Sequence, residues 1–267
     1  MGRASPPSPM NMLYAGDSAV GGSANYLLGI LRGMHAKTVH IPPSETLSPR
    51  LLSCRYDAII LSDFPAERVS RAAQRAIARQ VEAGAGLLMI GGWGSFSGPS
   101  GGWRGSLVET LLPVRCLDRD DRLHFPSGAL LVPSDHHEMF RALSFENPPV
   151  LCGLNVVQPR RGSRLVLAAR AMTTTCRAAG RPAHVTLGST AHPLLVVDAN
   201  PWQRVAALTT DLAPHWCGGL VDWGSRRVTL AVNRTIRVEV GDRYLQLVRG
   251  MLKWLTRAPQ DTGTGIC

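Results

Sequence analysis

The sequence contains almost no lysine: Lys37 and Lys253 are the only two, so arginine supplies nearly all of its 29 basic residues. A formal net charge of +10 at pH 7 invites a nucleic-acid partner. The arginines are nevertheless spread along the chain, and the densest series lies on one side of a helix predicted over 66–84, as a solvated face does. We therefore expect no nucleic-acid partner.

Long apolar runs and targeting signals are also missing. No run approaches the roughly 18 residues that a membrane-spanning helix needs. The opening residues MGRASPPSPMNM hold no apolar signal core, and Pro6 stands where myristoylation requires Ser or Thr. The six cysteines form no CxxC pair, and Cys54, Cys116 and Cys152 sit beside apolar residues. We expect a cytoplasmic protein with reduced, partly buried thiols, no membrane association, no bound metal and no cofactor.

A chain of 267 residues that is 45% hydrophobic can bury a sizeable core within one domain. It shows no internal repeat and no strong boundary, so we predict a single domain over 10–257. Residues 1–9 are predicted to be a disordered tail and 258–267 a loose one. The segment 172–190 has no clear period and is predicted to be an exposed insertion.

The first half of the chain alternates between predicted strands and helices. Apolar runs at 11–16, 38–41, 56–64 and 86–90 predict strands, and helical spacing appears at 23–36 and 66–84. Continuous apolar strands separated by helices indicate an α/β protein with a parallel sheet covered on both faces.

The second half is less regular. The spacing predicts short helices over 105–114 and 135–143, and two helical stretches after residue 217, the last over 243–257. Strands are predicted at 154–159, 164–170, 192–197 and 204–211.

Polar residues follow several predicted strands, where the carboxyl ends of a parallel sheet form a functional crevice. Asp17 follows the first strand, Ser95 the fourth, and Asp211 and His215 the strand RVAALTT. An Asp–His pair can act as general acid and base, so Asp17, Asp211 and His215 are our catalytic candidates. A structural explanation stays open: both aspartates could cap turns, and His215 could pack beside Trp216.

The run GLLMIGGWGSFSG, residues 86–98, predicts a buried strand that ends in a tight turn. We predict ligand-binding residues in this turn and near His215, namely Gly91, Gly92, Trp93, Ser95 and Trp216. An aromatic rim beside carboxylates suits a small polar ligand such as a sugar or an amino-acid derivative. The glycine-rich loop 98–105 is predicted to be mobile, with Trp103 as a lid, and the DRDD run at 118–121 to be a solvated turn.

The strings YDAIILSD, VEAGAGLLMIGGWGSFSG, HPLLVV and RVAALTTDLAPHW resemble the bacterial proteins called putative glutamine amidotransferases. The resemblance covers most of residues 10–257 and weakens over 160–190. It implies the fold of class I glutamine amidotransferases, a flavodoxin-like three-layer α/β sandwich with a mostly parallel central sheet. The turn Trp202-Gln203-Arg204 departs from the glycine-containing turn common in the family.

The resemblance also implies a Cys-His-Glu triad, with the cysteine on a G-x-C-x-G elbow. No register of residues 91–95 places a cysteine there, and two residues after His215 comes Cys217 instead of Glu. We therefore predict a glutamine amidotransferase-like protein that lacks the catalytic cysteine and binds a small polar ligand at the strand carboxyl ends. A hydrolase using Asp and His, with or without a metal, and a non-catalytic assembly or regulatory subunit remain alternatives. We expect a small-molecule ligand as its partner, and a homo-oligomer is an open alternative.

Overall fold

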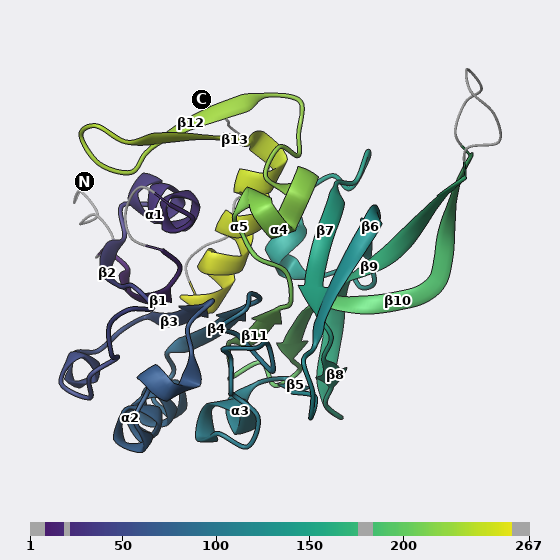
Figure 1. Cartoon of the computed structure of the whole chain (residues 1–267). Helices are drawn as coiled ribbons and strands as arrows, with labels where there is room; N and C mark the ends of the chain where they lie inside the picture. The colour runs from purple at the N-terminus through teal and green to yellow at the C-terminus, as the bar shows by residue number, and fades with distance from the viewer. Residues whose placement is uncertain (1–8, 19–21, 176–183, 258–267) are drawn as a thin grey trace.

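A nine-stranded sheet with helices on both faces organises the protein (Figure 1). The computed structural model describes residues 9–18, 22–175 and 184–257. The strand order is β2-β1-β3-β4-β11-β10-β9-β6-β7. The predicted tails 1–9 and 258–267 lie outside the described residues, apart from residue 9.

Half of the sheet is parallel. Its strands are β2 (Lys37–Ile41), β1 (Asn11–Gly16), β3 (Ala58–Ser62), β4 (Gly86–Ile90) and β11 (Val205–Leu208). Each pairs in parallel with its neighbour, so their carboxyl ends meet along one edge. The sequence predicted β3, β4 and β11 from continuous apolar runs, which suit strands buried on both faces, and the edge strand β2 from an alternating pattern.

Side chains on the parallel strands enter two separate cores. On β1, Met12 and Tyr14 join the core on one face, and Leu13 and Ala15 join the core on the other. The alternation follows from the two-residue period of a strand. It explains why the parallel strands read as continuous apolar runs.

Helices α1 (Ala24–Gly33) and α5 (Asp242–Leu255) cover one face of the parallel half (Figure 1). A hairpin of β12 (Arg227–Ala231) and β13 (Arg237–Gly241) packs on α1. Helices α2 (Arg71–Glu82) and α3 (Leu107–Leu111) cover the opposite face. The predicted α/β class and three-layer arrangement are confirmed.

Four antiparallel strands extend the sheet beyond β11. They are β10 (His184–Asp198), β9 (Ser163–Thr175), β6 (Arg122–Pro133) and β7 (Val150–Asn155). The sheet is therefore mixed. The smaller elements are a two-stranded sheet of β5 (Val114–Arg115) and β8 (Gln158–Pro159), the helical turn α4 (Pro214–Cys217), and 3₁₀ turns at Leu51–Ser53, Ala66–Arg68, Glu138–Phe140 and Gly218–Leu220.

Two expectations for the second half need correction, and a third gains structural detail. The stretch 135–143 forms only a 3₁₀ turn, because it is short and anchors Met139 and Phe140 beneath α5. The first helix expected after residue 217 is mainly the β12–β13 hairpin, whose exposure alternates with a strand period. The predicted insertion 172–190 is a ribbon in which β9 and β10 pair as far as Thr175 and His184. Residues 176–183 of that segment lie outside the described residues.

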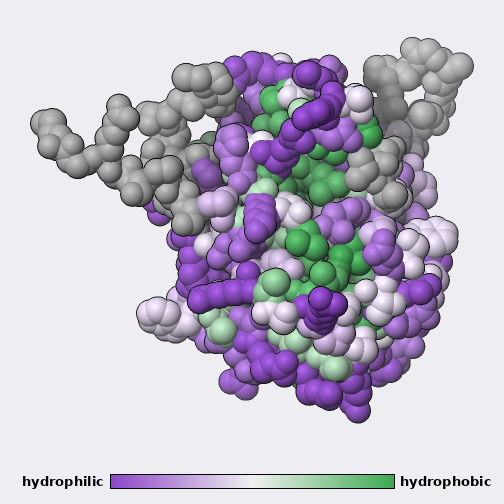
Figure 2. Space-filling view, turned by 90° about the vertical axis from the view of Figure 1, so that its left-hand side faces the viewer, coloured by the Kyte–Doolittle hydropathy of each residue, from purple (hydrophilic) through white to green (hydrophobic). Residues whose placement is uncertain are grey.

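The side of the molecule at the edge strand β2 is shown in Figure 2. Apolar side chains occupy the middle of this face, and polar ones surround them. Strand β2 is only partly buried and begins with the exposed Lys37, a charge of the kind that protects a sheet edge from further pairing. Among the residues that the structure describes, none of the helices combines the length and apolarity that crossing a bilayer requires.

The first prediction concerns Gly91, which directly follows β4. An added Cβ would lie 2.1 Å from the carbonyl oxygen of Thr209 and 2.8 Å from the side-chain oxygen of Asn155. We expect Gly91→Ala to lower the free energy of unfolding by about 2 to 4 kcal/mol, because backbone atoms must move apart. Urea denaturation followed by circular dichroism measures this change.

Gly33→Ala is the matched control, since a Cβ at this helical position meets no atom closer than 3.7 Å. It should leave the stability unchanged or raise it by up to about 1 kcal/mol. Equal effects of the two substitutions would contradict the close approach of β4 and β11.

Candidate functional site

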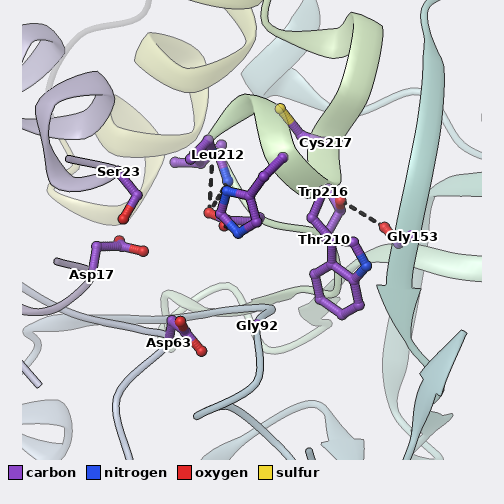
Figure 3. Close-up of polar contacts among 12 residues, drawn as sticks. Asp17, Ser23, Asp63, Gly92, Gly153, Thr210, Leu212, Trp216 and Cys217 are labelled. Atoms are coloured by element: carbon purple, nitrogen blue, oxygen red, sulfur yellow. Dashed lines mark hydrogen bonds and ion pairs between the residues drawn. The ribbon is translucent and has the colours of Figure 1, made fainter. Parts of the chain in front are cut away.

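Three aspartates follow the carboxyl ends of parallel strands: Asp17 after β1, Asp63 after β3 and Asp211 after β11. Figure 3 shows the side chains of Asp17 and Asp63 near one another, with Leu212 above them in this view. Asp17 and Asp63 have φ angles of 53° and 48°, a left-handed conformation that aspartate tolerates better than most residues. The chain therefore turns sharply just as each strand ends.

A close contact between β1 and β3 positions Asp17. At Gly16, φ is 142°, and a Cβ would lie 1.6 Å from the carbonyl oxygen of Ser62. The next amide, that of Asp17, donates to the same oxygen at 2.9 Å. Only glycine permits this approach, which brings Asp17 against the end of β3.

The Asp17 carboxyl group is buried and only 5% exposed. Burial is the main cause that raises its pKa to about 8, and the negative charge of Asp211 adds to the shift. The Tyr14 hydroxyl donates to Asp17 Oδ2, and this bond acts in the opposite direction. At neutral pH the protonated form of Asp17 therefore predominates.

Asp211 is 1% exposed and accepts two backbone hydrogen bonds through Oδ1, from Leu212 N at 2.5 Å and Ala213 N at 3.1 Å. Burial raises its pKa to about 7 against these two bonds, and the charge of Asp63 raises it further. The imidazole Nε2 of His215 lies 3.1 Å from Asp211 Oδ2. The angle between them is unsuitable for a hydrogen bond, so Oδ2 is buried without a donor.

His215 belongs to α4, four residues after Asp211, and its side chain is 61% exposed. The turn therefore holds an accessible imidazole against a buried carboxylate. An imidazole beside a carboxyl group can accept or donate a proton. The structure brings the predicted pair Asp211 and His215 together, and its catalytic role stays a prediction.

The turn after β4 is built around Asp63 and Asn155. Gly94 N donates to Asp63 Oδ1 at 2.5 Å, and a Cβ on Gly92 would lie 2.5 Å from the same atom. Asn155 is completely buried; its Oδ1 accepts from Gly92 N at 2.9 Å, and its Nδ2 donates to Gly92 O at 3.2 Å. The two glycines let the backbone pass between these side chains.

The sequence did not indicate that Asn155 and Asp121 take part in the hydrogen bonds around the turn after β4. Asn155 also donates to Asp121 Oδ1 at 2.6 Å, and Ser97 N donates to Asp121 Oδ2 at 2.7 Å. Asp121 is 2% exposed, so the DRDD run is not a wholly solvated turn as predicted. The sequence carries no local signal for this contact, because Asp121 and Asn155 meet only through the pairing of β6 and β7.

The other predicted ligand-binding residues differ in accessibility. Ser95 is 1% exposed; its hydroxyl donates to Ile90 O at 2.5 Å and accepts from Asp63 N at 3.0 Å. Trp93 is 52% exposed, and the guanidinium of Arg122 lies 4.1 Å from its ring centroid. The hydrogen bonds of Ser95 therefore stabilise the turn itself. Trp93 is half exposed, and Arg122 covers one face of its ring.

Trp216 is 3% exposed and packs on Gly153, where an added Cβ would lie 1.9 Å from its Nε1 atom. That nitrogen donates to His124 Nδ1 at 3.2 Å. The prediction that Trp103 is a lid residue is wrong: its side chain is completely buried, and its Nε1 donates to Phe64 O at 2.9 Å. An indole inserted into the core cannot open as a lid.

Four cysteines lie in the described part of the chain. Cys116 and Cys217 are buried, and burial raises the pKa of both thiols. Cys54 and Cys152 are exposed, contrary to the expectation that they are partly buried. Within the described ranges, no group of three or more His, Cys, Asp or Glu side chains could hold a metal ion.

Comparison with known protein families identifies the family of this chain. The family described as Putative glutamine amidotransferase (GATase1_like) matches residues 18–236. The chain belongs to this family. The matched region runs from the loop after β1 to the start of β13, so it includes Asp63, Asp211 and His215.

Solved structures share the fold of this family member. Cytoplasmic Protein STM3548 from Salmonella typhimurium is 23% identical with a TM-score of 0.66, and the alignment covers 91% of this chain and 98% of that one. Cytoplasmic Protein STM1381 from Salmonella typhimurium LT2 is also 23% identical, with a TM-score of 0.63 and coverages of 93% and 98%. A ThuA-like protein from Bacteroides uniformis has 14% identity, a TM-score of 0.53 and coverages of 96% and 94%. No curated protein matches the chain.

The second prediction is a pH dependence of stability caused by Asp17 and Asp211. Their ordinary pKa is 3.8, so between about pH 4 and pH 8 the folded protein binds more protons than the unfolded chain. The free energy of unfolding therefore falls as the pH rises through this range, by at most about 1.4 kcal/mol per pH unit for each group. Asp17→Asn removes one group and should make the decline shallower.

Urea denaturation at several pH values in this range measures the slope. Glu82→Gln, an exposed position at the end of α2, is the control and should keep the wild-type slope. An unchanged slope in Asp17→Asn would show that Asp17 titrates normally.

Proposed function

We propose that this family member binds a small polar ligand at the carboxyl ends of β1, β3, β4 and β11 and lacks the cysteine nucleophile of glutamine hydrolysis. The observation that carries the proposal is the meeting of Asp17, Asp63 and the Asp211–His215 pair at one edge of the sheet. Open α/β sheets bind their ligands at this edge.

The residues after β4 support the absence of the nucleophile. Residues 91–95 are Gly, Gly, Trp, Gly and Ser, so no thiol stands where the elbow of a class I enzyme would carry one. Of the described cysteines, Cys116 and Cys217 are buried with raised pKa values and remain protonated at neutral pH. A protonated thiol is a poor nucleophile.

A second candidate function is hydrolysis by the Asp211–His215 pair. The imidazole Nε2 lies 3.1 Å from Asp211 Oδ2, and the exposed ring could take a proton from a water molecule. A metal-assisted version has less support, since the described residues offer no cluster of three metal ligands. We further propose that the protein acts in the cytoplasm, as the names of the two Salmonella relatives state for those proteins.

The third prediction separates these functions from glutaminase activity. We expect purified protein to release no ammonia from glutamine above the rate of a buffer control, because no thiolate is placed at the elbow. A coupled glutamate dehydrogenase assay measures the release. Ammonia production that disappears in a Cys152→Ser or Cys217→Ser variant would contradict the absence of a nucleophile.

The fourth prediction tests ligand binding. Thermal shift against panels of sugars and amino acids should identify compounds that raise the Tm, as any ligand selective for the folded state does. His215→Ala should abolish the rise, whereas His136→Ala, which removes an exposed imidazole outside this edge, should retain it. A complete lack of response would favour a non-catalytic assembly or regulatory subunit.

A further inference from the structure

The carboxylates of this site have no guanidinium or ammonium partner in the described part of the chain, although the protein carries a net charge of +10. Arginines pair elsewhere with many acidic residues, among them Asp120, Asp135, Glu138, Asp222 and Asp242. No such ion pair reaches Asp17, Asp63 or Asp211. Asp211 has only His215 beside it, and Asp17 has only neutral hydrogen-bonding groups.

Two buried polar atoms at the site also lack hydrogen-bond partners. Asp211 Oδ2 has no donor in suitable geometry, and the Ser62 hydroxyl, which is completely buried at the end of β3, has no partner either. The Ser62 hydroxyl lies close enough to Asp17 to lower the pKa of that carboxyl group. Native proteins rarely leave such atoms unpaired. The Ser62 hydroxyl already interacts with Asp17, so the atom that points to a group supplied from outside the chain is Asp211 Oδ2.

We infer that the ligand presents a protonated primary amine to Asp17, Asp63 and Asp211. This inference rests on the proposed function and names the chemical class that the site would take. An ammonium group supplies three N–H donors and one positive charge, and Asp211 Oδ2 is a buried carboxylate oxygen without a hydrogen-bond donor. Among the described residues no arginine or lysine pairs with these carboxyl groups to balance an anion, so a phosphate or carboxylate fits this position less well than an ammonium group does.

Amine binding would also release protons. Burial raises the pKa of Asp17 and of Asp211, so both retain protons near neutral pH; the charge of Asp211 adds to the shift of Asp17, and the charge of Asp63 adds to that of Asp211. A positive charge next to them favours their ionised forms, so protons leave as the ammonium group enters. Proton release is a signature that binding of a neutral molecule would not produce.

The experiment is an NMR titration of the ¹⁵N-labelled full-length protein with four probes of similar size. Ethanolamine hydrochloride carries the ammonium group, ethylene glycol is its neutral analogue, sodium acetate is an anion, and magnesium chloride tests an inorganic cation. We expect ethanolamine to shift the amide signals of Asp63, Gly94, Leu212 and Ala213, whose backbone groups surround the carboxylates. Calorimetry in buffers of different ionisation enthalpy then measures the protons released.

Charge-removing variants assign the effect to this site. Asp211→Asn should weaken ethanolamine binding by about tenfold or more, the usual effect of losing a charged hydrogen-bond partner. Glu82→Gln removes the same charge at a distant exposed position and should bind as the wild type does. Spectra of the free variants show whether each is folded.

Each other result has a definite meaning. If ethylene glycol or acetate shifts the same signals as strongly as ethanolamine, the amine inference is overturned while the proposed function stands. If magnesium alone shifts them, the site recognises an inorganic cation and the amine inference fails. If no probe shifts them at concentrations in the tens of millimolar, the amine inference fails, and the thermal-shift panel of sugars and amino acids decides the proposed function separately.

Discussion

The close approach of backbone at the carboxyl ends of four parallel strands is the constraint on which the site depends. Gly16 lies against the carbonyl of Ser62, and Gly91 lies against the carbonyl of Thr209. Neither position has room for a Cβ, so the strands end side by side and the chain turns sharply after each one. These turns bring Asp17, Asp63 and Asp211 close enough for their charges to interact.

Burying the carboxyl groups of Asp17 and Asp211 in this packing disfavours their ionised forms. Two aspartates are almost completely buried, and burial is the main cause that raises the pKa of Asp17 to about 8 and that of Asp211 to about 7. The charge of Asp211 adds to the shift of Asp17, and the charge of Asp63 adds to that of Asp211. The Tyr14 hydroxyl and two backbone amides offset part of the cost without adding a positive charge. Buried carboxyl groups with strongly raised pKa values are typical of functional sites.

The turn after β4 shows how one fold can carry different chemistry. In this protein Asn155 and Asp63 hold the backbone of Gly92 and Gly94, and the Ser95 hydroxyl bonds back to Ile90. These side chains close the turn by themselves, and the exposed residue at its tip is Trp93. The likeness to the Salmonella structures extends over the whole domain, so it concerns the arrangement of the sheet and its helices rather than any residue at the tip.

The sequence by itself determined the α/β class, the parallel strands and the main helices, because apolar periodicity is local and records which faces are buried. It also placed Asp17, Asp211 and His215 at one edge, since parallel strands share their direction. Only the tertiary structure decided that Asn155 joins Gly92 to Asp121, that Trp103 is buried, and that residues 227–241 form a hairpin over α1. Those outcomes depend on contacts between segments far apart in the chain, and no local pattern of residues encodes such distances.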